Sequence, residues 1–194
     1  MRKAAVKRTT QETDIELELD MDGTGKYSVE TSVPFLDHML TLMARHGLFD
    51  LRVKATGDTH VDYHHLVEDM GIVMGQAIRD SVGDKRGIRR YGDATTPMDE
   101  TLAQVIVDLS GRAYLVYKVE QPTGMIRDLD ASLFEDFFRA VSSHAGMNLH
   151  VILHYGRDIH HIIEAVFKSF GRALGDAVTN DPRITGVRST KGIL

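Results

Sequence analysis

The sequence HHLVE at residues 64–68 recurs as HHIIE at residues 160–164, half a chain later. Residues four apart lie on the same face of a helix, so the first histidine of each copy can act with the glutamate that follows it. The second histidine lies about 100° further round the helix, where it is better placed to bind a neighbouring ion. A His-rich, solvated helix start would explain neither the repeat nor the clustering. The pattern predicts a duplicated fold with a two-metal site, whose ligands are His64, His65, Glu68, His160, His161 and Glu164.

The similarity between the two halves extends beyond these stretches. Equivalent positions, in order along the chain, are Glu12 and Glu100, His38 and Asp136, Gly47 and Gly146, and Gly57 and Gly156. The seam between the halves falls within residues 83–89. We therefore predict two structural repeats, residues 1–86 and 87–194, that form one compact unit.

Hydrophobic patterns give each half the order strand, turn, strand, helix, strand, helix. Alternation with period two predicts strands, and apolar residues at helical spacing predict helices. The strands cover residues 15–19, 51–55, 102–109, 114–119 and 149–154, and the helices begin at Pro34 or cover 65–78, 133–141 and 161–174. Residues 181–194 are expected to form a flexible tail. The predicted fold is α+β, with internally duplicated β-β-α-β-α-type halves and four helices packed between two sheets.

The composition excludes several classes of protein. The 194 residues include no cysteine, which excludes disulfides, thiolate zinc sites and a thiol nucleophile. Ten histidines indicate nitrogen and oxygen ligation instead, and so Mn, Fe, Zn or Mg. The net charge is −5 without a basic stripe, and no membrane-spanning run or signal peptide is recognisable. We expect a cytoplasmic protein that has neither nucleic acid nor a membrane as its partner.

Two further candidate ligands occupy equivalent places ahead of the histidine pairs, His38 in the first half and Asp136 in the second. They bring the donors to about four for each of two ions, which leaves open coordination positions for catalysis. The alternative for His38 is a surface histidine held by the neighbouring Asp37. The alternative for Asp136 is an acidic residue that favours the dipole of its own helix.

Basic and hydroxyl side chains form a second candidate group. Its members are Arg90, Arg112, Lys168, Ser189, Thr190 and Lys191. Lys168 lies about two helical turns beyond His160 on the same face, and the cluster at 189–191 can close over an anion. If these side chains converge beside the metals they suit a phosphorylated small substrate, whereas each alone is usually solvated surface. His46, at the start of a turn, is either a substrate contact or a loop histidine.

A series of short motifs runs through nearly the whole chain, at residues 8–13, 35–40, 46–50, 56–58, 64–69, 90–93, 97–102, 108–112, 160–165, 167–168 and 189–192. In this order they resemble the imidazoleglycerol-phosphate dehydratase family in its monofunctional form, a family of lyases in histidine biosynthesis. The paired histidine elements, together with DLSGR at 108–112, make the resemblance specific.

The resemblance implies a cofactor and an assembly. It implies two Mn²⁺ ions per active site and a large symmetric homo-oligomer of twenty-four subunits, with sites at the subunit interfaces. It also implies that the substrate phosphate is bound by Arg90, Arg112, Lys168, Ser189 and Lys191. Two positions depart from the family pattern. Asp136 stands where many relatives have histidine, and Leu42 stands where some have a polar glutamine.

The expected reaction is the manganese-dependent dehydration of D-erythro-imidazole glycerol phosphate to imidazole acetol phosphate through a metal-bound imidazolate. Glu12 is the expected base and a substrate contact, with an exposed strand-edge glutamate as the alternative. Glu68 and Glu164 are expected to serve catalysis as metal ligands. The competing hypotheses are a binuclear metal-dependent phosphohydrolase and a scaffold in which the metals only join subunits.

Overall fold

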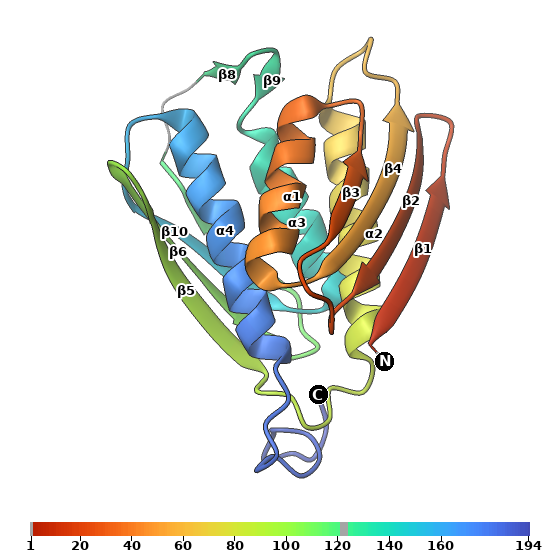
Figure 1. Cartoon of the computed structure of the whole chain (residues 1–194), viewed down its shortest axis with the longest axis vertical. Coiled ribbons are helices and arrows are strands. Elements are labelled where there is room, and N and C mark those ends of the chain that lie inside the picture. Colours follow the sequence, from red (N-terminus) through yellow and green to blue (C-terminus); the bar gives the residue numbers. More distant parts are fainter. Residues whose placement is uncertain (1, 121–123) are drawn as a thin grey trace.

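The structure is a computed structural model that describes residues 2–120 and 124–194 (Figure 1). The first half contains β1 (Lys3–Thr9), β2 (Thr13–Asp20), β3 (Tyr27–Glu30), α1 (Pro34–Gly47), β4 (Asp50–Gly57) and α2 (His64–Val82). The second half contains β5 (Tyr91–Met98), β6 (Thr101–Asp108), β7 (Tyr114–Lys118), β8 (Met125–Ile126), β9 (Leu129–Asp130), α3 (Leu133–Ala145), β10 (Asn148–Tyr155) and α4 (Ile159–Val178).

The two large sheets share one topology. Their strand orders are β1-β2-β4-β3 and β5-β6-β10-β7, and β8 and β9 form a separate hairpin. In each large sheet the first three neighbours pair antiparallel, and the last strand pairs parallel with the one before it. The α+β fold with duplicated halves is therefore confirmed, and β8–β9 is an addition to the second half.

Each large sheet contains one strand more than the hydrophobic pattern predicts, and both additional strands, β1 and β5, are sheet edges. Their inward residues give a weak signal. In β5 these residues are Gly92, Ala94 and Thr96, which are small or polar, and Pro97 follows them. Proline is tolerated at a sheet edge because that side of the strand needs no donor.

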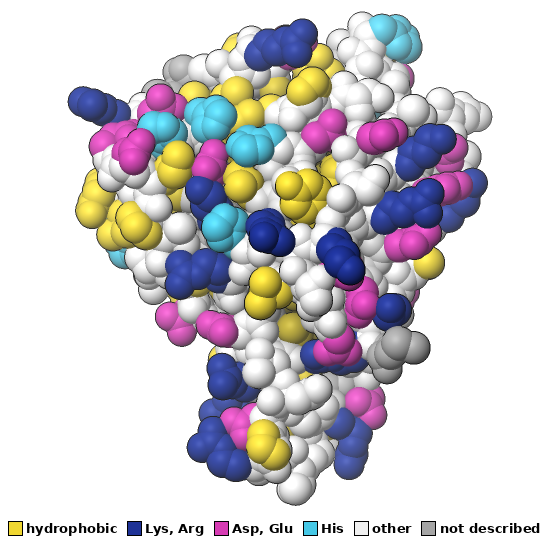
Figure 2. Space-filling view, viewed as in Figure 1, with side chains coloured by type: hydrophobic (Ala, Val, Ile, Leu, Met, Phe, Trp, Pro, Cys, Tyr) yellow, Lys and Arg dark blue, Asp and Glu magenta, His cyan; other side chains and the backbone are white. Residues whose placement is uncertain are grey.

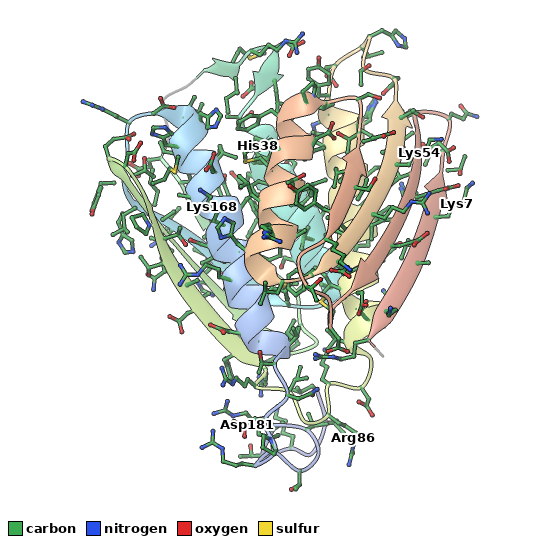
Figure 3. The ribbon with its side chains drawn as sticks, viewed as in Figure 1. Lys7, His38, Lys54, Arg86, Lys168 and Asp181 are labelled. Carbon is green, nitrogen blue, oxygen red and sulfur yellow. The ribbon has the colours of Figure 1, made fainter. Side chains whose placement is uncertain are left out.

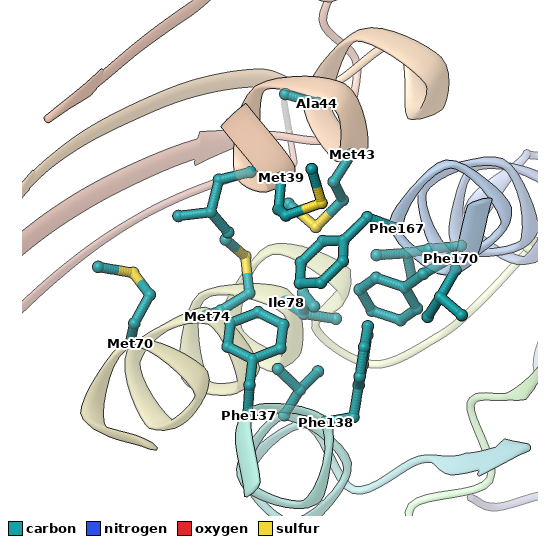
Figure 4. Packing of buried hydrophobic residues seen from close by; sticks show 14 of the residues in the cluster. Met39, Met43, Ala44, Met70, Met74, Ile78, Phe137, Phe138, Phe167 and Phe170 are labelled. Carbon is teal, nitrogen blue, oxygen red and sulfur yellow. The ribbon is translucent and has the colours of Figure 1, made fainter. Parts of the chain in front are cut away.

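The four helices lie between the two sheets (Figure 1). Helix α2 packs on β1 and β2, α1 on β3, α3 on β7, and α4 on β5 and β6. One continuous core fills the space between them. Its centre is shown in Figure 4, where methionines of α1 and α2 meet the phenylalanines of α3 and α4. The labelled side chains include Met39, Met43, Met70, Met74, Phe137, Phe138, Phe167 and Phe170.

Two equivalent glycines allow helices from different halves to approach closely. A Cβ atom on Gly75 of α2 would lie 2.8 Å from the carbonyl oxygen of Val141 in α3. A Cβ atom on Gly171 of α4 would overlap the carbonyl oxygen of Met43 in α1. The pairs α2–α3 and α1–α4 are therefore held at backbone contact, and these are the pairs that carry the predicted metal ligands.

The chain after α4 packs against the connection between α2 and β5. Isolated bridges pair Ile88 with Asn180 and Arg86 with Val187. The segment predicted as a flexible tail is therefore held against the seam, at the lower end of the molecule in Figure 1. In the part of the chain that the structure describes, no helix is long and apolar enough to cross a membrane.

Candidate active site

The first group of predicted ligands meets where α1 packs against α4. The Nε2 atoms of His38 and His160 lie 3.3 Å and 3.2 Å from the same carboxylate oxygen of Glu164. Ligand atoms of the three residues lie within 4.8 Å of one another. Glu164 is buried, whereas both histidines are nearly half exposed, so the cluster opens to solvent (Figure 3, where His38 is labelled).

These distances suit a divalent cation. Two ligands that bind an ion at right angles, each at about 2.1 Å, are themselves about 3 Å apart. The carboxylate also carries the required charge. Burial opposes ionisation of Glu164, but the Lys168 ammonium and the two histidines outweigh it and hold the pKa of this carboxyl below its usual value. Imidazole and carboxylate together suit Mn, Fe or Zn.

The equivalent cluster lies where α2 packs against α3. Nε2 of His64 is 3.9 Å from a carboxylate oxygen of Glu68, and Nδ1 of the same ring is 3.8 Å from one of Asp136. Asp136 thus takes the place that His38 has in the first cluster. The two carboxylates face opposite nitrogens of one ring, so His64 cannot direct a single ion to both. A ligand role for Asp136 stays a prediction.

The second histidine of each pair turns away from its cluster toward another carboxylate. Nδ1 of His65 pairs with Asp58 at 3.0 Å, and Nδ1 of His161 pairs with Glu100 at 2.8 Å. These pairings raise the pKa of both histidines. Glu12, the predicted base, lies 3.8 Å from the opposite nitrogen of His65.

Two aspartates fix the helix starts that carry the histidine pairs. The Asp62 carboxylate accepts a hydrogen bond from the backbone amide of His64 at 2.8 Å. Asp158 accepts from the amides of His160 and His161. Asp158 is the N-cap of α4, and both aspartates satisfy amides that the first turn of a helix leaves free. The pattern Asp-x-His-His occurs in both halves. This repeated pattern could have predicted both aspartates, although the hydrophobic periodicity could not.

Lys168 and His46 lie beside the first cluster rather than with the other predicted phosphate ligands. Lys168 bonds to Glu164, one turn away on α4. His46 lies in the last turn of α1, not in the turn that the sequence indicated. Burial lowers the pKa of His46, and the positive charges of Lys168 and Arg172 lower it further. These contacts place the imidazole near the cationic groups of α4.

The remaining basic and hydroxyl candidates line one surface cavity of about 720 Å³. Its lining includes the predicted Arg90, Arg112, Ser189, Thr190 and Lys191. Arg188, which the sequence did not single out, joins them. Arg90 is held by Asp108 through bonds of 2.7 Å and 3.1 Å, and this pairing raises the pKa of the guanidinium. Asp108 therefore orients Arg90 in the cavity.

The clusters of predicted metal ligands and this cavity lie at opposite ends of one chain. His160 is the second residue of α4, whereas the amide of Arg90 bonds to the carbonyl of Ala177 near the end of that helix, at 2.9 Å. The 17 helical steps from His160 to Ala177 span about 26 Å. Figure 2 shows histidines gathered over the upper part of one face and basic side chains at the lower end. Within one chain, of the basic and hydroxyl candidates, only Lys168 lies beside a cluster of predicted metal ligands, and the others line the distant cavity.

Comparison with known proteins assigns the family. The model of the imidazoleglycerol-phosphate dehydratase family matches residues 31–174. The chain belongs to this family. The imidazoleglycerol-phosphate dehydratase of Geobacter sulfurreducens is 58% identical over 193 residues, which cover 100% of this chain and 99% of the relative. That of Geobacillus thermodenitrificans is 55% identical with the same coverage.

Solved dehydratase structures agree with the fold. The Staphylococcus aureus imidazoleglycerol-phosphate dehydratase superposes with a TM-score of 0.84 at 40% identity, over 92% of this chain and 99% of that one. The Pyrococcus furiosus protein gives 0.85 at 36% identity, over 97% and 100%. The resemblance drawn from the motifs is confirmed, and so is the prediction of an enzyme, since the family consists of hydro-lyases.

Proposed function

We propose that this protein is a cytoplasmic enzyme of histidine biosynthesis that dehydrates imidazole glycerol phosphate to imidazole acetol phosphate with the help of manganese. The observation that carries the proposal is the cluster of His38, His160 and Glu164 where α1 packs against α4. Family membership favours dehydration over the competing phosphohydrolase. The basic cavity supports a phosphorylated substrate.

Two Mn²⁺ ions would be held by the histidines and glutamates of the repeated motif, with His38 and, as a prediction, Asp136. When bound, such ions act as Lewis acids that stabilise negative charge on a coordinated imidazole ring. The open sides of both clusters leave room for a substrate ring. The protein side chains then have three tasks, which are to orient the substrate, to keep its phosphate in place and to move a proton.

Glu12 is the proposed base. Its carboxylate is 53% exposed and lies 3.8 Å from His65, so it can reach a substrate that approaches this histidine from solvent. Removal of a proton by a positioned carboxylate accelerates a reaction by about 10²–10⁴-fold. Arg90, Arg112 and the hydroxyl and ammonium groups of 189–191 would bind the phosphate, which contributes orientation. Lys168 and His46 would contact the substrate beside the first cluster.

One substrate cannot touch both ends of the same chain. An extended imidazole glycerol phosphate is roughly 10 Å long, far less than the separation along α4. We therefore propose that each active site takes its metal end and its phosphate end from different copies, in a closed homo-oligomer of twenty-four subunits. His65 and His161, whose Nδ1 atoms are engaged by Asp58 and Glu100, would complete the metal sites of neighbouring copies through Nε2.

The test follows two products at once. Purified protein loaded with Mn²⁺ is incubated with imidazole glycerol phosphate, and both ketone and free phosphate are measured. Ketone that disappears on chelation and returns with Mn²⁺ is the expected result. Phosphate release without ketone would support the hydrolase, and the absence of both products would support the scaffold.

A further inference from the structure

The two halves present equivalent glutamates at equivalent hairpin turns. Glu12 precedes β2 and Glu100 precedes β6, and these strands occupy the same place in their sheets. Each glutamate lies beside the second histidine of its half. If the two halves were identical in function, Glu12 and Glu100 would have the same role, but their contacts differ.

The Glu100 carboxylate is fully engaged. One oxygen accepts a hydrogen bond from Nδ1 of His161 at 2.8 Å. The other accepts from the amide of Asp158 at 3.0 Å and from the hydroxyl of Thr101 at 3.1 Å. These three hydrogen bonds fix Glu100 as an acceptor that sets the orientation of the His161 ring.

In the first half, Asp58 rather than the hairpin glutamate orients the histidine ring. Nδ1 of His65 pairs with Asp58 at 3.0 Å, while Glu12 lies 3.8 Å from Nε2 on the other side of the ring. Asp58 is tied to the same turn, because its amide donates to the carbonyl oxygen of Glu12 at 3.0 Å. In the described residues, the Glu12 carboxylate accepts no hydrogen bond, and it is 53% exposed against 26% for Glu100.

The second half has no counterpart of Asp58. Asp58 follows Gly57 at the end of β4, and the residue that follows the equivalent Gly156 is Arg157. An arginine has no acceptor for the N–H of a histidine. The task of orienting the histidine therefore falls to the hairpin glutamate in the second half and to the post-strand aspartate in the first.

The turn that carries Glu12 is held without using its carboxylate. The neighbouring Thr13 donates its hydroxyl hydrogen to the buried Asp69 of α2 at 2.5 Å, and Arg8 pairs with the same aspartate at 3.0 Å. Glu12 is thus fixed at its backbone and free at its side chain. This is the arrangement that a proton-transfer group needs.

We propose that Asp58 and Glu100 are positioning residues that hold the rings of His65 and His161 through Nδ1, which leaves Nε2 for the metal and frees Glu12 for proton transfer. A carboxylate on the far nitrogen of a ligating histidine fixes its tautomer and raises its basicity. This inference rests on the proposed function, because it assumes that the second histidines bind the metal.

The experiment separates metal binding from turnover. The full-length protein is stripped of metal, and Mn²⁺ is titrated back while free Mn²⁺ is followed by electron paramagnetic resonance. The variants are Asp58→Ala, Asp58→Asn, Glu100→Ala and Glu12→Ala, with the exposed Asp80→Asn as the control for loss of a surface charge. Circular dichroism of each metal-free variant checks that it is folded.

We expect Asp58→Ala and Glu100→Ala to weaken Mn²⁺ binding by about 10–100-fold. Asp58→Asn should weaken it less, because its amide oxygen still accepts a hydrogen bond from Nδ1. Glu12→Ala should bind Mn²⁺ like the wild type and lose ketone formation. The graded response of Ala and Asn at position 58 separates positioning from a general loss of structure.

Wild-type Mn²⁺ affinity in Asp58→Ala would overturn the proposal, and so would equal losses of affinity in Glu12→Ala and Asp58→Ala. A wild-type protein that binds Mn²⁺ but forms no ketone refutes the proposed function while the affinities still test Asp58 and Glu100. A wild-type protein that binds no Mn²⁺ refutes both.

Discussion

Mixed oligomers of two inactive variants test whether an active site is shared between chains. Glu12→Gln removes the proposed base at one end of the molecule, and Arg112→Ala removes a phosphate contact at the other. Glu12 lies beside His65, the second residue of α2. The cavity that Arg112 lines lies near the opposite end of this helix, because the Lys85 ammonium is 3.4 Å from the Cβ position of Gly111. The 19 residues of α2 separate these ends by about 28 Å.

The expected activity follows from this separation. If base and phosphate grip come from different chains, a random equal mixture gives each end a wild-type residue half the time. About one quarter of the sites then contain both, and activity rises to about a quarter of the wild-type value. The two variants are co-expressed with different affinity tags, and particles that carry both tags are purified in sequence and assayed for ketone.

The control is the same two variants mixed after separate purification, which should remain as inactive as each alone. Co-expressed particles with no more activity than the separate variants would show that Glu12 and Arg112 serve the same site from one chain. That result would refute the conclusion that the separation along the helices excludes an active site within a single subunit.

Three further predictions follow from packing and charge. Gly171→Ala forces α4 away from Met43 and should destabilise the fold by about 1–3 kcal/mol, whereas Gly124→Ala, with nothing within 4 Å, should leave the thermal unfolding midpoint unchanged. Phe137→Ala opens a cavity among rings 5.2–5.3 Å away and should cost about 3–5 kcal/mol in urea unfolding. Hydrogen bonds from the amides of Thr24 and Lys26 hold the pKa of Asp50 below its unfolded value of 3.8. The contribution of the Asp50 carboxylate to the free energy of unfolding is therefore complete above pH 3.8 and is lost as pH falls through the folded pKa. The stabilities of Asp50→Asn and the wild type should therefore converge on acidification.

The sequence predicted the elements that have strong periodicity. The alternation in β2 corresponds to inward residues that are all buried, and Pro34 marks the first residue of α1. The hydrophobic pattern did not predict the edge strands β1 and β5, because an edge strand needs fewer large apolar residues on its inner face. The boundary of α1 was placed too early, so His46 was assigned to a turn although it lies in the last helical turn.

The histidines and carboxylates of the candidate site could be named from the sequence, but which of them lie together could not. Periodicity shows which residues share a helix face, but it does not show that His38 of the first half meets His160 of the second. That contact depends on α1 packing against α4, which Gly171 makes possible. The separation of the basic cavity from the predicted metal ligands depends on the direction of α4, and no local pattern carries this information.

The duplicated halves also show that residues at equivalent positions of a repeat can have different roles. Glu12 and Glu100 are equivalent in sequence and in sheet topology, yet Glu100 accepts from three donors while the Glu12 carboxylate is exposed. The difference lies in the connection before the histidine helix, where Asp58 offers an acceptor and the second half has Arg157 in a shorter connection. Once an aspartate orients the histidine, the hairpin glutamate beside it no longer has to. If the proposed function holds, the glutamate that Asp58 releases in the first half is the one available for proton transfer.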